Sequence, residues 1–247
     1  GRRSAGVVDT RNGLNMTSLA LPPRAGKVAL ITQSQSLTAG ALDWALGRNI
    51  GFSWLACTGA EADIDAADLL DHAALDPRTR AVVLQIGDIH QPRKFMSAAR
   101  AAARVKPVLV LQTQSRNARV MGPDPVRSAA FARAGLIECE NLGGLFDGLA
   151  ALDLLPAVQA DRVMVLGNGA GVCALANDAL RRKSLAAARP GSEMAAALAD
   201  IAPRAHDTPA GIDLAGSNTQ ETVEVLRAAL ANSKRDGVLL VHSPVAG

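Results

Sequence analysis

The chain has 247 residues, of which 49% are apolar and 20% charged, with a formal net charge of +3 and a pI near 9.0. Scattered positive charges, no tyrosine and only two tryptophans argue against a nucleic-acid surface, and the longest apolar runs are too short to span a membrane. The three cysteines, Cys57, Cys139 and Cys173, are too few and too widely spaced for a disulfide framework or a structural zinc site, so we expect no metal.

The first 26 residues show no regular pattern, and Pro22, Pro23 and Gly26 predict a linker and an extended arm there. From Lys27 onward, short apolar runs alternate with amphipathic segments of helical length, which is typical of β-α units on a parallel sheet. The predicted strands are residues 27–32, 52–57, 81–86, 108–113 and 136–140. The predicted helices are residues 37–47, 66–75, 93–104, 126–134 and 143–154. The pattern predicts a flavodoxin-like domain over residues 27–155.

The pattern restarts after Pro156 with the strand RVMVLG, the turn GNGAG and the helix VCALANDALRR. Further helices are expected at residues 192–201 and 220–231, and a strand at 237–242. We therefore predict a second flavodoxin-like domain over residues 160–247. A parallel strand needs a crossover helix to cover it, so we expect this domain to be truncated at Gly247. The connecting segment LPAVQADR, residues 155–162, is expected to be exposed.

Two polar turns follow strands and precede helices, where free backbone N–H groups can hold a phosphate. The first turn predicts phosphate binding by Ser34, Gln35 and Ser36, and the second predicts it for the residues Asn168, Gly169, Ala170 and Gly171. Gln35 stands in the middle of the first turn, where glycine would let a ligand approach the backbone. We therefore expect the first turn to be partly closed and an anion to prefer the second.

Asp88 and His90 follow the third strand of the first domain and are candidates for an acid–base pair. The alternative for His90 is a solvated histidine in a polar loop. Asp63 and Asp65 offer a similar choice: they could act as acid–base groups, but a carboxylate just before a helix is typical of an N-cap, and we favour the cap.

Five strings occur in an order that resembles the NDP-forming acyl-CoA synthetases and the related succinyl-CoA synthetases. They are TQSQS, GFSWLACTGAEADIDAADLLDHAALDPRT, AAFARAGLIECENLGGLFD, NGAGVCALANDAL and PAGIDLAG. The resemblance implies CoA or acyl-CoA and ATP or ADP as ligands of the whole protein. It also implies a CoA-binding domain upstream, ending near GRRSAG, and an ATP-grasp domain as a partner. In that family a histidine carries a phosphoryl group between two helix N-termini, which here would follow Ser36 and Gly169.

The chain departs from this family at three points of the relay. The segment QTQSRNARVMGPDPVRSAAF contains no histidine, Ile86 to Ile89 replace the string that holds the orienting glutamate, and Gln35 replaces a glycine. GPDPVRSAAFARAG is similar to the ligase-like region of bacterial protein lysine acetyltransferases, in which such a region is fused to a GNAT domain.

The resemblance implies a degenerate module that is inactive alone and has a regulatory, CoA-sensing or scaffolding role. We expect a cytoplasmic location, because no apolar run is long enough to span a membrane. One alternative is a fragment of an active ADP-forming acetyl- or acyl-CoA synthetase with a displaced histidine, His90 being the first candidate. Another is an assembly module that forms a homo-oligomer and binds no ligand.

Overall fold

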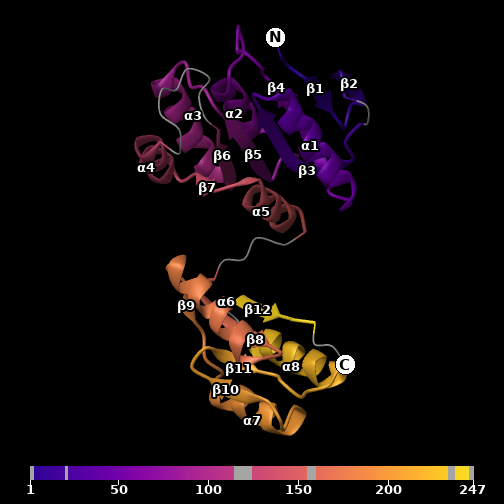
Figure 1. The fold of residues 1–247 in the computed structure, drawn as a ribbon, viewed down its shortest axis with the longest axis vertical. Coiled ribbons are helices and arrows are strands. Elements are labelled where there is room, and N and C mark those ends of the chain that lie inside the picture. Colours follow the sequence, from indigo (N-terminus) through magenta and orange to yellow (C-terminus); the bar gives the residue numbers. More distant parts are fainter. Residues whose placement is uncertain (1–2, 20–21, 114–123, 155–159, 233–236, 245–247) are drawn as a thin grey trace. The chain divides into compact units, whose positions relative to one another are not determined.

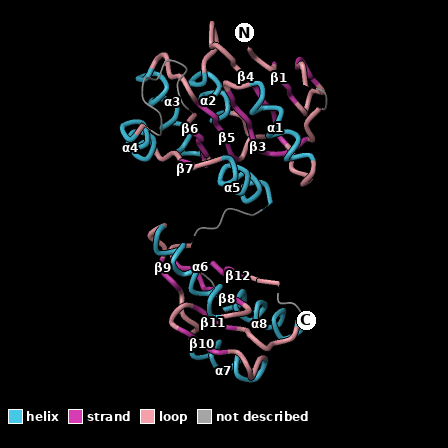
Figure 2. Tube along the Cα trace, viewed as in Figure 1, coloured by secondary structure: helices cyan, strands magenta, loops and turns pink. Residues whose placement is uncertain are grey.

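The computed structural model describes residues 3–19, 22–113, 124–154, 160–232 and 237–244 (Figures 1 and 2). The chain divides into two compact units, Gly1–Pro156 and Ala157–Gly247. Each unit is an α/β structure built on a mainly parallel sheet, so the predicted fold class is confirmed. Within the described residues, no helix combines the length and the apolar character needed to cross a bilayer.

The first unit contains a seven-stranded sheet in the order β2-β1-β4-β3-β5-β6-β7. Its strands are β1 (Gly6–Asp9), β2 (Leu14–Thr17), β3 (Ala25–Thr32), β4 (Phe52–Cys57), β5 (Ala81–Ile86), β6 (Val108–Gln112) and β7 (Ile137–Cys139). Strands β3 to β7 are parallel and follow the flavodoxin order 2-1-3-4-5. Every residue of β4 and β5 is buried, because helices cover both faces of the sheet.

Five helices cover this sheet in two layers (Figure 1). On one face, α1 (Gln35–Leu46) and α5 (Leu142–Leu154) share a core with β3 and β6. On the other face lie α2 (Ala66–Leu75), α3 (Pro92–Val105) and α4 (Pro125–Ala134). Asp65 caps α2 by accepting from the N–H groups of Ala67 and Asp68, so the cap interpretation of Asp65 is confirmed. Because β3, β5 and β6 are parallel neighbours, their carboxyl ends lie at one rim of the sheet.

The predicted arm over residues 1–26 is wrong for its central part, because β1 and β2 form an antiparallel hairpin that pairs with β4. The Thr10 hydroxyl strengthens the attachment by donating to the carbonyl oxygens of Phe52 and Ser53 at 2.8 and 2.9 Å. The hairpin covers what would otherwise be an edge of the sheet. Its sequence signal is Asn12–Gly13, a pair typical of tight hairpin turns.

The second unit has β8 (Arg162–Gly167) at the centre of a five-stranded sheet, with β12 (Gly237–Val241) and β11 (Gly211–Asp213) as parallel neighbours. Strand β9 (Ala186–Ala187) pairs with the start of β8, and β10 (His206–Thr208) is antiparallel to β11. The helices are α6 (Ala170–Arg182), α7 (Ser192–Ile201) and α8 (Thr219–Asn232). Sequence patterns missed β9, β10 and β11, because strands of two or three residues are too short to show alternation.

Several sequence predictions fall outside the described residues. These are residues 114–123 of the histidine-free interval 112–131, most of the predicted linker at 155–159, and the chain ends at Gly1, Arg2 and Gly247.

Candidate functional site

The first predicted phosphate turn is the beginning of α1. Ser34 is its N-cap, and its hydroxyl accepts from the N–H of Leu37 at 3.4 Å. Gln35 is the first residue of the helix and not the middle of a turn, which corrects the expectation from sequence. Its backbone is therefore helical, and its effect on a ligand comes from the side chain alone.

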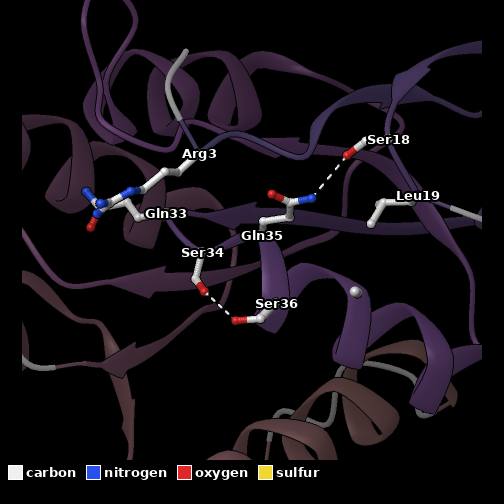
Figure 3. A pocket seen from close by; sticks show the side chains of 8 residues that line it. Arg3, Ser18, Leu19, Gln33, Ser34, Gln35 and Ser36 are labelled. Carbon is white, nitrogen blue, oxygen red and sulfur yellow. Dashed lines mark hydrogen bonds between the residues drawn. The ribbon is translucent and has the colours of Figure 1, made fainter.

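A cavity of about 600 Å³ lies in front of this helix (Figure 3). Its lining residues are Arg3, Ser18, Leu19, Gln33, Ser34, Gln35, Ser36 and Ala39. The Gln35 amide crosses the cavity and donates to the Ser18 hydroxyl at 3.2 Å, while the hydroxyls of Ser34 and Ser36 lie 3.1 Å apart. An oxyanion approaching the helix N-terminus would meet these polar side chains before it met the backbone.

Behind this cavity, buried glutamine side chains join the ends of three strands. The Gln33 side chain accepts from the N–H groups of Gly87 and Asp88 at 2.7 and 2.9 Å and donates to the Asp88 carbonyl oxygen at 2.7 Å. Gln85 accepts from the Gln33 N–H at 3.0 Å and donates to the Thr113 hydroxyl at 2.8 Å. Sequence reasoning missed this network, although a glutamine within the apolar run AVVLQI was a readable signal.

Asp88 and His90 line a second cavity, of about 500 Å³, between α3 and α4. No hydrogen bond or ion pair joins these two residues in the described part of the chain, so the expected acid–base pair is not formed in this structure. None of the residues that line this cavity lines the one in front of α1. His90 therefore does not face the first phosphate turn.

None of the other three histidines lines the cavity in front of α1. His72 is exposed on α2 and lies 5.4 Å, centroid to centroid, from the ring of Trp54. His206 is in β10, and His242 follows β12 in the second unit.

Arg127 is a second residue of the site that sequence reasoning missed. It lies in the first turn of α4, and its Nη1 donates to the Gly87 carbonyl oxygen at 2.9 Å. Burial lowers the pKa of Arg127, while the charges of Asp124, Asp88 and Glu138 act in the opposite direction. The signal in the sequence was a cation in the first turn of a helix, where the helix dipole disfavours it.

The second predicted phosphate turn precedes α6. The Asn168 side chain bonds the backbone of Ser243 in both directions, at 2.6 and 2.8 Å, so its polar groups are already used. Gly169 is the N-cap without a side-chain cap, and its φ of 164° is extended. A Cβ at Gly169 or Gly171 would meet no atom within 4 Å. A side chain would therefore find space at either glycine, and neither glycine is needed to avoid a clash.

The described residues contain no group of three or more His, Cys, Asp or Glu side chains that could hold a metal ion.

Comparison with known proteins places these features in a family context. The succinyl-CoA ligase-like flavodoxin domain matches residues 25–152, which is more than half of the chain. The ADP-forming acetate–CoA ligase I subunit alpha of Pyrococcus furiosus is 34% identical over 190 residues, covering 73% of this chain and 41% of that protein. The ADP-forming acetate–CoA ligase I of Archaeoglobus fulgidus is 27% identical over 257 residues, covering 100% of this chain and 37% of that protein.

Among solved structures, the chain is similar to a dinucleotide-forming acetyl-coenzyme A synthetase 1 of Ca. Korarchaeum cryptofilum in complex with phosphate and ADP. The TM-score is 0.88 at 25% identity, covering 98% of this chain and 55% of that chain. The chain therefore spans only part of each of these relatives.

Proposed function

This chain belongs to the family of succinyl-CoA ligase-like flavodoxin domains, and from that membership we propose that it is a degenerate acyl-CoA synthetase module without a phosphohistidine relay. In this proposal it is a regulatory, CoA-sensing or scaffolding part of a larger acetyltransferase-like protein. The observation that carries the proposal is the cavity in front of α1. The Gln35 side chain crosses it to Ser18, and no histidine lines it.

A phosphohistidine relay needs an imidazole within reach of the helix N–H groups that stabilise the dianion. The chain has four histidines, and none of them lines the α1 cavity. The position expected for the orienting glutamate is also altered, because residues 86–89 contain no glutamate. The Gln33 side chain binds the backbone of Gly87 and Asp88 there. These features support a module that keeps the fold of the synthetases without their phosphoryl transfer.

The ligands and partners follow from the family. CoA or acyl-CoA and ATP or ADP would be ligands of the whole protein. A CoA-binding domain and an ATP-grasp or GNAT domain would be its partners, on the same chain or on another. The α6 turn, where no side chain stands at Gly169 or Gly171, is the part of this chain that we propose for anion contact.

One alternative is that the chain is part of an active ADP-forming acetyl-CoA synthetase. The names of the relatives from Pyrococcus and Archaeoglobus favour it. In that case His90 would be the displaced nucleophile and Asp88 its neighbour, since both line the cavity between α3 and α4.

Phosphorylation decides between the two. The chain is incubated with γ-labelled ATP, CoA and the CoA-binding and ATP-grasp partners, and the label is tested for acid lability and base stability. We expect no label on this chain, with the Pyrococcus relative as the positive control. A stoichiometric phosphohistidine would overturn the proposal, and its loss in His90→Asn would establish the alternative. A melting temperature raised by CoA supports sensing, whereas dimerisation without any ligand effect indicates a pure assembly module.

A further inference from the structure

Strand β2 forms one edge of the seven-stranded sheet. It is the last strand in the order of that sheet and pairs with β1 alone among the described strands. The Ser18 N–H, just after β2, donates to the Ala5 carbonyl oxygen at 3.0 Å. Backbone groups alternate in direction along an antiparallel strand, so those of Met16 also face β1, whereas those of Asn15 and Thr17 face outward.

The hydrogen bonds of the Asn15 side chain agree with this orientation. Its Oδ1 accepts from the Thr17 N–H at 3.2 Å and from the Thr17 hydroxyl at 2.6 Å. The Thr17 N–H is thus bound by an exposed side chain of its own strand and not by β1. The Asn15 side chain occupies the place at which the carbonyl group of a further strand would accept.

The side chains beside this edge form an exposed apolar patch. Met16 lies directly opposite Val7, and Leu14 is two residues from Met16, so all three lie on one face of the sheet. They are 69%, 43% and 44% exposed for Met16, Val7 and Leu14. Natural edge strands are usually protected by charged residues, proline or a bulge. The sequence of β2, LNMT, contains neither a charge nor a proline, and its register with β1 is continuous.

A second copy of the same strand is complementary to this edge. When two β2 strands run antiparallel about a two-fold axis at Met16, Asn15 of each copy lies opposite Thr17 of the other. Each outward N–H and carbonyl group of these residues then has a partner. The two Met16 side chains meet across the axis, and the two apolar patches join on one face of a continuous sheet. Residues 12–19 carry no charge, so like charges do not oppose the pairing.

We propose that two copies of this chain associate through antiparallel pairing of their β2 strands. Asn15 and Thr17 supply the hydrogen bonds, and Met16 packs against Met16 of the second copy. Because β2 has only four residues, we expect a dissociation constant in the micromolar range. The pairing goes beyond the proposed loss of the phosphohistidine relay, and neither depends on the other.

The proposed contact lies beside the cavity in front of α1. Ser18 follows β2 and lines that cavity, where its hydroxyl accepts from the Gln35 side chain at 3.2 Å (Figure 3). In the proposed register, Leu14 of the second copy lies opposite Ser18. Association would therefore hold the wall of the cavity to which Gln35 is bound.

Sedimentation equilibrium on the full chain, from micromolar to millimolar concentration, tests the association. Met16→Lys places two like charges opposite each other at the axis and should weaken association about tenfold or more. The matched control is Leu175→Lys, because Leu175 is also 69% exposed but lies on α6 of the second unit, and it should leave association unchanged. Thr17→Pro removes an outward N–H and keeps the Met16 side chain, and it should also weaken association about tenfold.

Disulfide crosslinking tests the register. Residues directly opposite each other in an antiparallel pair have Cα atoms about 4.5–5.5 Å apart, a distance that a disulfide can span. Met16→Cys should therefore crosslink two copies at least about tenfold faster than Leu14→Cys, because the two copies of position 14 are four residues apart along the paired strands. The proposal is wrong if the unchanged chain stays monomeric at all these concentrations, or if Met16→Lys or Thr17→Pro associates as Leu175→Lys does. Equal crosslinking at positions 14 and 16 would also overturn it.

Discussion

The Gln33 side chain binds the backbone of Asp88 through both of its polar atoms. Oε1 accepts from the Asp88 N–H at 2.9 Å, and Nε2 donates to the Asp88 carbonyl oxygen at 2.7 Å. These bonds join the end of β3 to the loop that follows β5. Residues of that loop, Gly87 to His90, line the cavity between α3 and α4. One buried amide therefore holds the backbone beside both cavities, the one in front of α1 and the one between α3 and α4.

Replacing Gln33 by alanine leaves the N–H groups of Gly87 and Asp88 without their acceptor. Gln33 is 6% exposed, so we expect a loss of roughly 2–4 kcal/mol in the free energy of unfolding. The matched control is Gln35→Ala, which removes an exposed glutamine of the same turn and should cost less than about 1 kcal/mol. Equal losses for the two variants would contradict the role given to Gln33.

Urea denaturation followed by tryptophan fluorescence is the measurement for Gln33→Ala. The chain has two tryptophans, Trp44 and Trp54, and both lie in the first unit. The fluorescence signal therefore reports the unfolding of that unit and not of the second.

We expect the folded protein to lose stability at acid pH because of the carboxylate of Asp76. Its side chain is 4% exposed and accepts from Arg78, Thr79 and the Trp54 indole. Burial raises the pKa of Asp76, but the hydrogen bonds from Arg78 and Thr79 outweigh this effect, and the pKa is about 2. The folded-state pKa lies below the ordinary value of 3.8, so the contribution is fully present above that pH and is lost as the pH falls toward 2.

We expect Asp76→Asn to lower the free energy of unfolding by about 2 kcal/mol at pH 7 and to flatten its pH dependence below pH 4. The control Asp71→Asn removes an exposed carboxylate of α2. Urea denaturation at pH 7 and pH 3 measures both variants. An undiminished pH dependence in Asp76→Asn would show that another carboxylate is responsible.

Gly6 determines whether β1 and β2 can pair within the N-terminal hairpin. Its φ is +110°, and a Cβ at this position would lie 1.9 Å from the Met16 carbonyl oxygen. Gly13 also has a positive φ of +65°, but a Cβ there would meet nothing within 4 Å. Gly6→Ala should therefore separate the two strands, whereas Gly13→Ala carries only backbone strain of about 1 kcal/mol.

Hydrogen exchange measures this difference. We expect the amides of β1 to exchange at least about tenfold faster in Gly6→Ala than in Gly13→Ala, which corresponds to about 1.4 kcal/mol of local stability. Similar protection in the two variants would mean that the contact between Gly6 and Met16 does not hold the hairpin.

The two phosphate turns should differ in anion binding. Each helix N-terminus offers an anion roughly 0.3–2 kcal/mol. The Gln35 side chain crosses the cavity at the α1 turn, whereas Gly169 and Gly171 place no side chain at the α6 turn. Gly171→Val should weaken phosphate binding at the α6 turn, and Gly171→Ala should weaken it less. Gln35→Gly should improve phosphate binding at the α1 turn. Two measurements check these expectations. One is a phosphate titration followed by amide NMR shifts, and the other is the structure of crystals soaked in sulfate. Strong sulfate density at Ser34 to Ser36 with none at Asn168 to Gly171 would reverse the assignment.

Local patterns in the sequence were sufficient for most of the fold. The strands Phe52–Cys57 and Ala81–Ile86 and the helix Ala66–Leu75 have the bounds that their apolar spacing predicts. Their periods and caps depend on residues within one or two turns of each other, so they can be read along the chain. The hairpin of β1 and β2 was missed although Asn12–Gly13 signals it, because its strands have four residues each.

What the sequence by itself determined about this protein is its class, the order of its units, the two turns at which helices begin, and the absence of a histidine from residues 112–131. Only the tertiary structure decided which side chains meet at those turns. Gln33 and Asp88 are 55 residues apart, Gly87 and Arg127 are 40 apart, and Asn168 and Ser243 are 75 apart. Helical and strand patterns repeat over a few residues, whereas contacts of this separation depend on how the parallel strands are ordered in the sheet, which no local period encodes.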